Sequence, residues 1–276
     1  MTQLSHKRSI DLGDVQRTLL LPLWGRAVET RRAKPLLVDR AAAEIIRSID
    51  YDFSTFAANI DPISQYAWIC RSIHCDRMIK EFLSQHPRGT VVNVGCGLDT
   101  TFERVDNGAL RWYDLDLPDV IQLRKNFIPE SVRRTFIECS FLDDSWFRQV
   151  ERAEPVMFMA AGVLYYFDEP QVREILVNVA NKFPGSKLAF DACSPKGVDI
   201  ANKKVIKDSG MSSKSNLRWG LDRADRLVSW DDRVRILEEF PMFKGMKKGL
   251  SVRNKLVATV SDFYKIGFMV RAEFLI

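Results

Sequence analysis

Hydrophobic residues in the first third of the chain recur at helical spacing. One set is spaced by four, three, one and three positions, which places its members on a single helix face: Val38, Ala42, Ile45, Ile46 and Ile49. A second set predicts another helix that ends at the Pro87–Gly89 break: Ile69, Ile73, Phe82 and Leu83. Because no strand-like alternation precedes this break, the pattern predicts an N-terminal helical extension over residues 1–86.

After the break, short apolar runs alternate with amphipathic or polar segments. The runs are TVVNVG, LRWYDLDL, TFIECSFL, PVMFMAAG and KLAFDAC, and FMVRAEFLI closes the chain. Runs of this length, buried on both faces and separated by ten to thirty residues, are typical of parallel strands joined by helical crossovers. We therefore predict an α/β fold with a doubly wound sheet over residues 87–276, and one domain for the whole chain.

The clearest crossover helix follows the fourth of these runs. Asp168 is its expected N-cap, Pro170 lies in its first turn, and four residues form its apolar face: Val172, Ile175, Leu176 and Val179. Residues from about 194 to 228 are mostly polar and rich in lysine and serine, so we expect an inserted lid segment there. A further helix is expected to begin near Ser229, with Asp232 three residues on.

Composition limits the classes of function. The 276 residues are 46% hydrophobic and 28% charged, as in ordinary globular proteins. The net charge of +5 comes from scattered residues, and without a basic stripe we expect no nucleic-acid partner. Five cysteines without a CxxC pair predict no metal site and a reducing compartment. The N-terminus does not resemble a signal peptide and no apolar run reaches membrane-spanning length, so we expect a cytoplasmic protein without a membrane partner.

The most informative stretch is VVNVGCGLDT, followed by WYDLDLP. A buried strand that runs into Gly95-Cys96-Gly97 makes a tight turn at the carboxyl end of the sheet, where ligands bind in such folds. Asp116 follows Gly97 by 19 residues, at the predicted end of the next strand. A carboxylate there can accept hydrogen bonds from both ribose hydroxyls of a nucleoside.

The residues after the turn favour one nucleoside cofactor over another. Thr100 stands where a dinucleotide fingerprint would have a third small residue, and Asp99 precedes it. A carboxylate at a helix N-terminus repels a pyrophosphate but tolerates an ammonium group. S-Adenosylmethionine is therefore favoured over NAD. A nicotinamide-dependent oxidoreductase stays an alternative, although the chain lacks the third glycine and a second nucleotide-binding half.

Taken together, GCGLDT, DLDLP, AGVLYYF and FDACSP resemble the leucine carboxyl methyltransferase superfamily, in order and spacing. The resemblance is closest to the branch that includes the tetracenomycin polyketide synthesis O-methyltransferases, and it extends from the ETRR region near Glu29 to the final strand. It implies a Rossmann-like class I methyltransferase sheet, with S-adenosylmethionine as cofactor and S-adenosylhomocysteine as product.

The resemblance also implies roles for individual residues. Arg71 matches an arginine that holds the carboxylate of the cofactor, and Asp116 matches its ribose ligand. Gly95 and Gly97 match the glycine turn beside the methionine part, and we interpret Cys96 as a small packing residue within that turn.

Three further positions depart from the pattern of the protein-methylating members. Ser140 and Phe141 stand where those members carry Asp-Leu against the adenine, and Ala161 stands where they carry the glutamate of an E-G-V motif. These departures point away from a protein acceptor and towards a small molecule.

The candidate catalytic residues are less specific. Tyr165 and Tyr166 follow the fourth strand, where acceptor and cofactor would meet, and His74 lies one turn after Arg71. Asp191, at the end of the fifth strand, could line the acceptor pocket, and Trp219 or Trp230 could pack on a planar acceptor.

The expected reaction depends on the acceptor. A carboxylate is already ionised and needs no base, whereas a phenol would need His74 or a tyrosine to deprotonate it. We expect an O-methyltransferase for a small organic acid or a polyketide-like acceptor. A phenol, a protein C-terminal carboxylate and a non-catalytic binding module stay open as alternatives.

Overall fold

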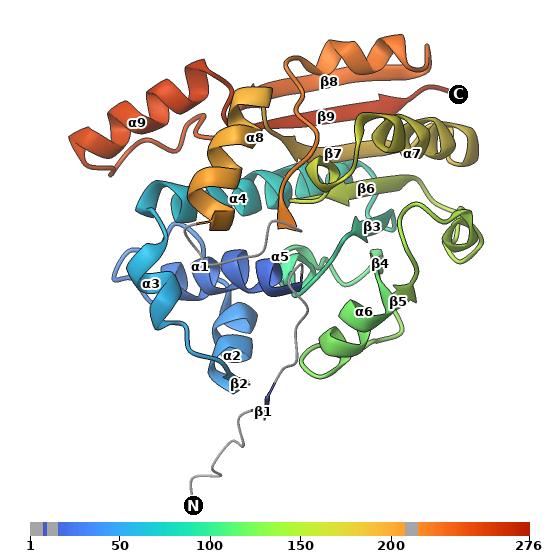
Figure 1. Cartoon of the computed structure of the whole chain (residues 1–276). Helices are drawn as coiled ribbons and strands as arrows, with labels where there is room; N and C mark the ends of the chain where they lie inside the picture. Colours follow the sequence, from blue (N-terminus) through green and yellow to red (C-terminus); the bar gives the residue numbers. More distant parts are fainter. Residues whose placement is uncertain (1–7, 10–15, 208–214) are drawn as a thin grey trace, which may run out of the picture.

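The computed structural model describes residues 8–9, 16–207 and 215–276, and its centre is a seven-stranded sheet (Figure 1). The strands lie in the order β5-β4-β3-β6-β7-β9-β8. Their bounds are β3 Thr90–Val94, β4 Arg111–Asp116, β5 Arg134–Glu138, β6 Val156–Ala160, β7 Lys187–Ala192, β8 Val234–Pro241 and β9 Phe268–Phe274. Each of the apolar runs noted above becomes a strand, so the predicted strands are confirmed.

The order of the strands makes the sheet doubly wound. From β3 the chain adds β4 and β5 on one side, and then returns to add β6 and β7 on the other. All these neighbours pair in parallel, whereas β9 pairs antiparallel with β7 and with β8. The predicted Rossmann-like class is therefore correct, with an antiparallel pair at one edge. Because the order in which strands are added reverses between β3 and β6, a crevice opens at the carboxyl ends of these two parallel strands.

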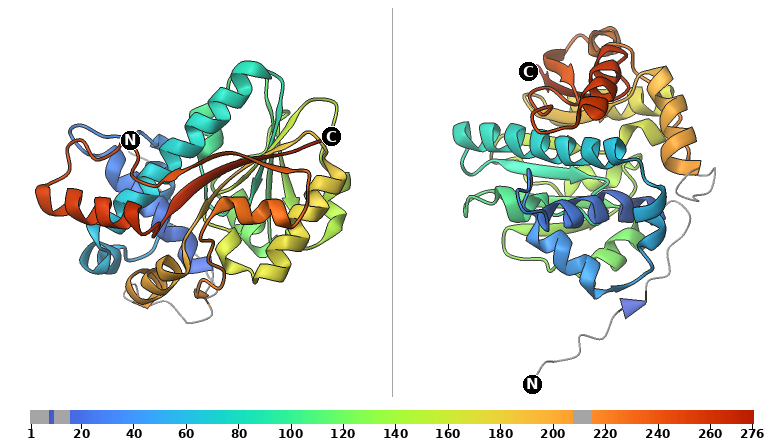
Figure 2. Two further views of the ribbon diagram at one scale, coloured as in Figure 1. Left: turned by 90° about the horizontal axis from the view of Figure 1, so that it is seen from above. Right: turned by 90° about the vertical axis from the view of Figure 1, so that its left-hand side faces the viewer.

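The N-terminal extension is helical, as predicted. It contains η1 (Gln16–Leu19), α1 (Leu20–Thr30), α2 (Arg40–Ser48), α3 (Ser54–Asn59) and the long α4 (Pro62–Gln85). Two details correct the prediction: Val38 is half exposed, outside α2, and the two-residue strands β1 (Arg8–Ser9) and β2 (Ile49–Asp50) pair in parallel. In Figure 2 the blue helices α1, α2 and α3 pack together, whereas the cyan helix α4 lies along one face of the sheet.

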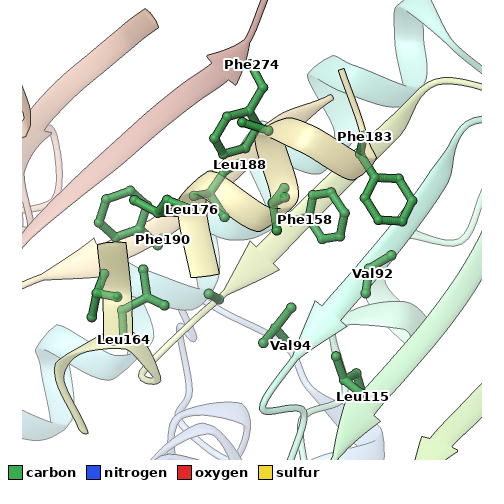
Figure 3. Packing of buried hydrophobic residues seen from close by; sticks show 14 of the residues in the cluster. Val92, Val94, Leu115, Phe158, Leu164, Leu176, Phe183, Leu188, Phe190 and Phe274 are labelled. Carbon is green, nitrogen blue, oxygen red and sulfur yellow. The ribbon is translucent and has the colours of Figure 1, made fainter. Parts of the chain in front are cut away.

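Short helices cover the two faces of the sheet. On the crossovers lie α5 (Thr101–Val105), α6 (Pro118–Lys125), η2 (Asp144–Arg148), η3 (Leu164–Tyr166) and α7 (Glu169–Lys182). The start of α7 is as predicted, because Asp168 is the N-cap and its N–H donates to Gln171 Oε1. The predicted apolar face of α7 is buried against Phe158, Leu188 and Phe190 of the central strands (Figure 3).

The chain after β7 differs most from the expectation. The polar segment includes α8 (Pro195–Ala201), the π-helix η4 (Asn202–Lys207) and the 3-10 helix η6 (Ala224–Ser229), while residues 208–214 lie outside the described residues. The prediction of a helix that starts near Ser229 is wrong, because the following residues form strand β8 and pair with β9. The structure also contains a helix that was not predicted, α9 (Val252–Phe263). The hydroxyl of its N-cap residue, Ser251, accepts a hydrogen bond from the Asn254 N–H.

Candidate active site

A cavity of about 890 Å³ opens at the carboxyl ends of β3, β4, β6 and β7. The N-terminal helices α1 and α4 wall it on one side, and residues of α8, η4 and α9 wall it on another. Its position is the strand-order reversal where open α/β sheets bind their ligands, and its volume is in the range of small-molecule sites.

The glycine turn lies at the base of this cavity. Gly95 and Gly97 have φ values of 59° and 45°, in the left-handed region that other residues rarely adopt. A Cβ on Gly95 would lie 2.6 Å from Val163 Cγ2, and one on Gly97 would lie 2.7 Å from Leu19 Cδ2. The glycines are therefore needed for the backbone path and for packing against Val163 and Leu19.

A buried arginine fixes the carbonyl groups of the turn. Arg124, on α6, is fully buried and donates to the Gly97 carbonyl at 2.7 Å and to the Asp99 carbonyl at 2.8 Å. The same guanidinium pairs with Asp114 at 3.0 Å, and Asp114 also accepts from Arg134 at 2.7 Å. The turn is thus held from behind by charged groups, and its shape does not depend on a bound ligand.

Asp116 ends β4 beside the turn and lines the cavity. Its Oδ2 accepts from the Gly97 N–H at 2.7 Å, and its Oδ1 accepts from the Leu117 N–H at 2.8 Å. Each oxygen keeps a second lone pair, so the carboxylate can still accept two hydroxyl groups. Burial raises the pKa of Asp116 to about 6, although the two N–H bonds oppose this rise.

Asp99 is a second carboxylate in the wall of the cavity. Burial raises its pKa, but the charges of Arg26 and Arg104 and the hydrogen bonds from Thr101 outweigh burial and hold the pKa at about 2. The Thr101 N–H donates to Asp99 at 2.8 Å. A permanently ionised carboxylate here suits a cationic ammonium group.

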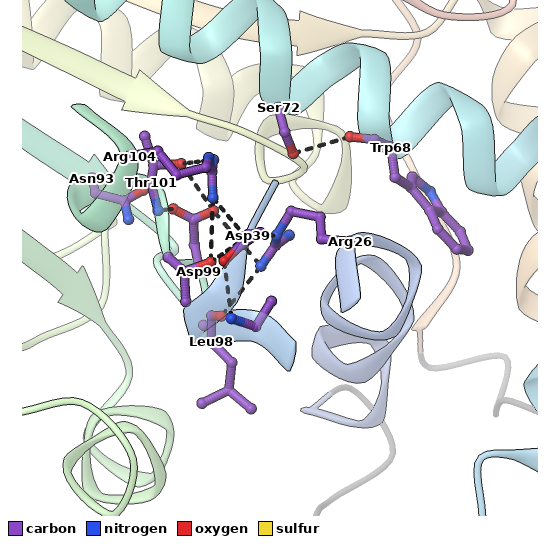
Figure 4. A network of polar contacts seen from close by, with 12 residues as sticks. Arg26, Asp39, Trp68, Ser72, Asn93, Leu98, Asp99, Thr101 and Arg104 are labelled. Carbon is purple, nitrogen blue, oxygen red and sulfur yellow. Dashed lines mark hydrogen bonds and ion pairs between the residues drawn. The ribbon is translucent and has the colours of Figure 1, made fainter. Parts of the chain in front are cut away.

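The cations beside Asp99 belong to a network that joins the helical extension to the sheet (Figure 4). Asp39, the N-cap of α2, accepts from Arg26 at 2.8 Å, from Arg104 at 2.7 Å and from Thr100 at 2.6 Å. Arg104 also forms a two-pronged pair with Asp76 of α4. No local motif in the sequence marks this network, because its members lie far apart in the chain.

Arg71 reaches the cavity from α4, where its guanidinium is almost buried. Its Nη1 donates to Asp191 Oδ2 at 3.0 Å and to the Tyr165 hydroxyl at 3.1 Å. Asp191 Oδ1 in turn accepts from the Gly162 N–H at 2.5 Å, and a Cβ on Gly162 would lie 2.7 Å from Arg71. Burial lowers the pKa of Arg71, but the charge of Asp191 more than offsets this, so the guanidinium stays charged.

The other predicted cofactor residues also lie in the cavity wall: Cys96, Ser140, Phe141 and Ala161. The ring of Phe141 packs 5.6 Å from that of Trp146, and Ser140 Oγ accepts from the Leu142 N–H. Cys96 is buried, and burial raises its thiol pKa well above the usual value, so the thiol stays protonated. The structure therefore brings all eight predicted cofactor residues together.

His74 is a correction, because the structure does not bring it to the site. The side chain is buried away from the cavity, Nε2 lies 3.0 Å from the Met242 carbonyl, and the ring meets Phe240 edge-on. Arg71 and His74 are three positions apart on α4, yet they face different neighbours. Trp219 and Trp230 also lie outside the cavity wall, where their rings pack 6.0 Å from each other.

Tyr165 and Tyr166 do line the cavity, on η3. Burial raises the pKa of both phenols, and for Tyr165 the neighbouring Asp191 raises it further. Both hydroxyls are therefore protonated at neutral pH and can donate hydrogen bonds, but neither is ready to remove a proton.

Comparison with known proteins identifies the family of this chain. Residues 20–180 match the family model for leucine carboxyl methyltransferase. The tetracenomycin polyketide synthesis O-methyltransferase TcmP of Streptomyces glaucescens is 31% identical over 236 residues, 85% of each chain. The chain belongs to the leucine carboxyl methyltransferase family. It is a methyltransferase, and S-adenosylmethionine is its methyl donor.

More distant relatives agree with this assignment. An S-adenosyl-L-methionine-dependent methyltransferase, dpfgK, of Gibberella zeae is 28% identical over 288 residues, covering 95% of this chain and 94% of its own. A proposed methyltransferase from Thermobifida fusca aligns with a TM-score of 0.60 at 15% identity, over 99% of this chain and 97% of its own. The last comparison supports the fold alone.

Membrane-spanning helices and clusters of metal ligands are both absent from the described residues. No described helix is long and apolar enough to cross a bilayer. Within residues 8–9, 16–207 and 215–276, no group of three or more histidine, cysteine, aspartate or glutamate side chains could hold a metal ion.

Proposed function

We propose that this methyltransferase transfers its methyl group to an oxygen of a small organic acid or polyketide-like acceptor, at a carboxylate. The observation that carries the proposal is the chemistry of the cavity wall. The described part of that wall contains no histidine, and the two buried tyrosines that follow β6, Tyr165 and Tyr166, have raised pKa values. The third tyrosine of the wall, Tyr264, lies at the end of α9 and is half exposed. A carboxylate acceptor needs no base, whereas a phenol does.

The carboxylates of the wall are engaged in other tasks. Asp99 is too acidic to remove a proton from a phenol, and Asp191 is committed to Arg71 and the Gly162 N–H. Asp61 caps α4 through the Ile63 N–H. Asp116, with a pKa of about 6, is assigned to the ribose hydroxyl groups.

The residues of the cavity fit the cofactor, on three observations. The backbone of the turn presents no side chain at Gly95 and Gly97, Asp116 has free lone pairs beside it, and an anion at Asp99 and a cation at Arg71 lie in the same wall. These two charges have the signs needed to bind the ammonium and carboxylate of the methionine part. When bound, the cofactor supplies an electrophilic methyl group on a sulfonium.

The chain contributes positioning rather than acid–base chemistry. The apolar walls exclude water from the acceptor oxygen, and the fixed turn and ion pairs orient both reactants. Positioning of this kind can lower a barrier by about 7–11 kcal/mol. We assign Tyr165 and Tyr166 to hydrogen-bond donation towards the acceptor.

We assign the lid role to α8 and η4 within a single domain. Lys196, Ile200 and Lys204 are spaced by four residues and all line the cavity, so one face of this helical segment covers it. The helices α1 and α4 close the opposite side.

A transfer assay separates the two acceptor classes. The protein is incubated with S-adenosylmethionine labelled in the methyl group and with matched aromatic acids and phenols, such as 2-naphthoic acid and 2-naphthol. A methyl ester releases labelled methanol in mild base, whereas a methyl ether does not. We expect base-labile product from acids, and base-stable product from phenols alone would refute the proposal.

A further inference from the structure

The outer face of α9 exposes large apolar side chains. Val252, Leu256 and Phe263 are 86%, 66% and 80% exposed, and Val260 and Tyr264 are close to half exposed. Residues at these spacings lie on one side of a helix. The opposite side packs on the protein through Ala258, the one fully buried residue of α9. Together these five exposed residues form what we call the α9 patch.

Basic residues are frequent on α9 and on the loop that precedes it. The segment 242–265 contains six basic residues and a single acid, Asp262. Lys247 pairs with Asp262 and Lys265 pairs with Glu239. The other four basic residues are exposed and form no ion pair with any described residue: Lys244, Lys248, Arg253 and Lys255.

We infer that the α9 patch is a docking surface for an anionic phospholipid bilayer. A helix with exposed Val, Leu and Phe side chains among lysines has the composition of helices that lie in the membrane interface. The patch is on a helix at the periphery of the molecule (Figures 1 and 2), where a flat bilayer can reach it. Apolar side chains enter the bilayer, and the four unpaired cations face the lipid phosphates.

The same charges argue against a second copy of the chain as the occupant. A twofold contact places a patch against itself, so the unpaired cations of the two copies would meet. A bilayer with anionic lipids supplies the opposite charge instead.

The patch is continuous with the cavity. Val257, Val260 and Tyr264 of the same segment line the cavity, and Lys196 of α8 lies 3.8 Å from the centre of the Tyr264 ring. A docked bilayer would therefore lie beside the α8–α9 side of the cavity. The docking surface does not depend on which acceptor the enzyme uses.

Co-sedimentation with vesicles tests this inference on the full chain. The vesicles contain phosphatidylcholine alone or phosphatidylcholine with phosphatidylglycerol. We expect binding that rises with phosphatidylglycerol and falls with added salt. Leu256→Ser or Phe263→Ser should weaken it about tenfold or more, since each removes one large apolar side chain from the interface.

The controls keep the outcome decisive. Neither Leu256 nor Phe263 lines the cavity, so both variants should keep their affinity for S-adenosylhomocysteine. Val132 is 95% exposed beside β5, at the opposite edge of the sheet, and Val132→Ser should bind vesicles like the wild type. The inference is overturned if the wild type ignores anionic vesicles, if all three variants behave alike, or if sedimentation shows a dimer that Leu256→Ser dissociates.

Discussion

Arg71 and Asp191 lie 120 positions apart in the chain, yet their side chains meet at 3.0 Å in the wall of the cavity. Asp191 holds the guanidinium by one oxygen and the Gly162 N–H by the other, so it links α4 to the loop after β6. The pair places a fixed positive charge where the proposed site holds the carboxylate of the methionine part.

Replacing Asp191 should weaken the binding of only those ligands that carry the carboxylate of the methionine part. In Asp191→Asn the guanidinium of Arg71 loses its charged partner. We therefore expect the Kd for S-adenosylhomocysteine to rise about tenfold or more. The Kd for 5′-methylthioadenosine, which lacks the amino-acid part, should change little. Calorimetric titration with both ligands checks this, and an equal loss for both would mean that Asp191 is only structural.

Asp116 should make cofactor binding depend on pH. Its pKa of about 6 means that the carboxylate becomes protonated below neutral pH and then accepts hydroxyl groups less well. If only the ionised form binds, affinity for S-adenosylhomocysteine falls about tenfold between pH 7 and pH 5, and recovers as the pH rises. Titrations across this range should show the change in wild type and a flat, weak profile in Asp116→Asn. A wild-type profile without slope would contradict the assignment.

Arg124 should matter for stability and for the glycine turn together. Arg124→Met leaves the Gly97 and Asp99 carbonyls without their donor and removes a buried partner of Asp114. We expect the free energy of unfolding to fall by about 3 kcal/mol, with weaker cofactor binding. Denaturant unfolding measures the first effect. In the control Arg133→Gln, a more exposed pair with Asp106 is lost, and stability should change by less than about 1 kcal/mol.

His74 should be dispensable for methyl transfer. Its Nε2 is occupied by the Met242 carbonyl, burial lowers its pKa, and the side chain does not line the cavity. His74→Gln should keep kcat within about twofold while losing about 1 kcal/mol of stability. Initial rates and thermal unfolding test this. A loss of kcat by about a hundredfold at unchanged S-adenosylhomocysteine affinity would instead restore His74 as a base.

Local pattern was enough to predict the parallel core. The strands β3 to β7 are continuous apolar runs, and the turn at Gly95 and Gly97 and the acid at Asp116 follow strand ends directly. Their meeting at one edge of the sheet follows from the parallel order of the strands. For this reason the predicted cofactor residues converge in the structure.

The features that the sequence did not predict depend on contacts between segments far apart in the chain. The strand β8 has polar residues at several positions and is stabilised by pairing with β9, so a capping signal at Ser229 suggested a helix instead. Arg71 and His74 differ in role because of what packs against α4, which their spacing does not reveal. The ion pairs of Asp39 and Asp191 join elements far apart in the chain, and no motif marks them.

We assign the cofactor to the cavity at the Gly95–Gly97 turn, with Asp116 as the ribose ligand. Calorimetric titration of wild type and Asp116→Ala with S-adenosylhomocysteine, and with NAD in parallel, tests it most directly. We predict one binding site per chain for S-adenosylhomocysteine, a loss of affinity of about tenfold or more in Asp116→Ala, and no response to NAD. Unchanged affinity in the variant, or binding of NAD alone, would contradict the claim.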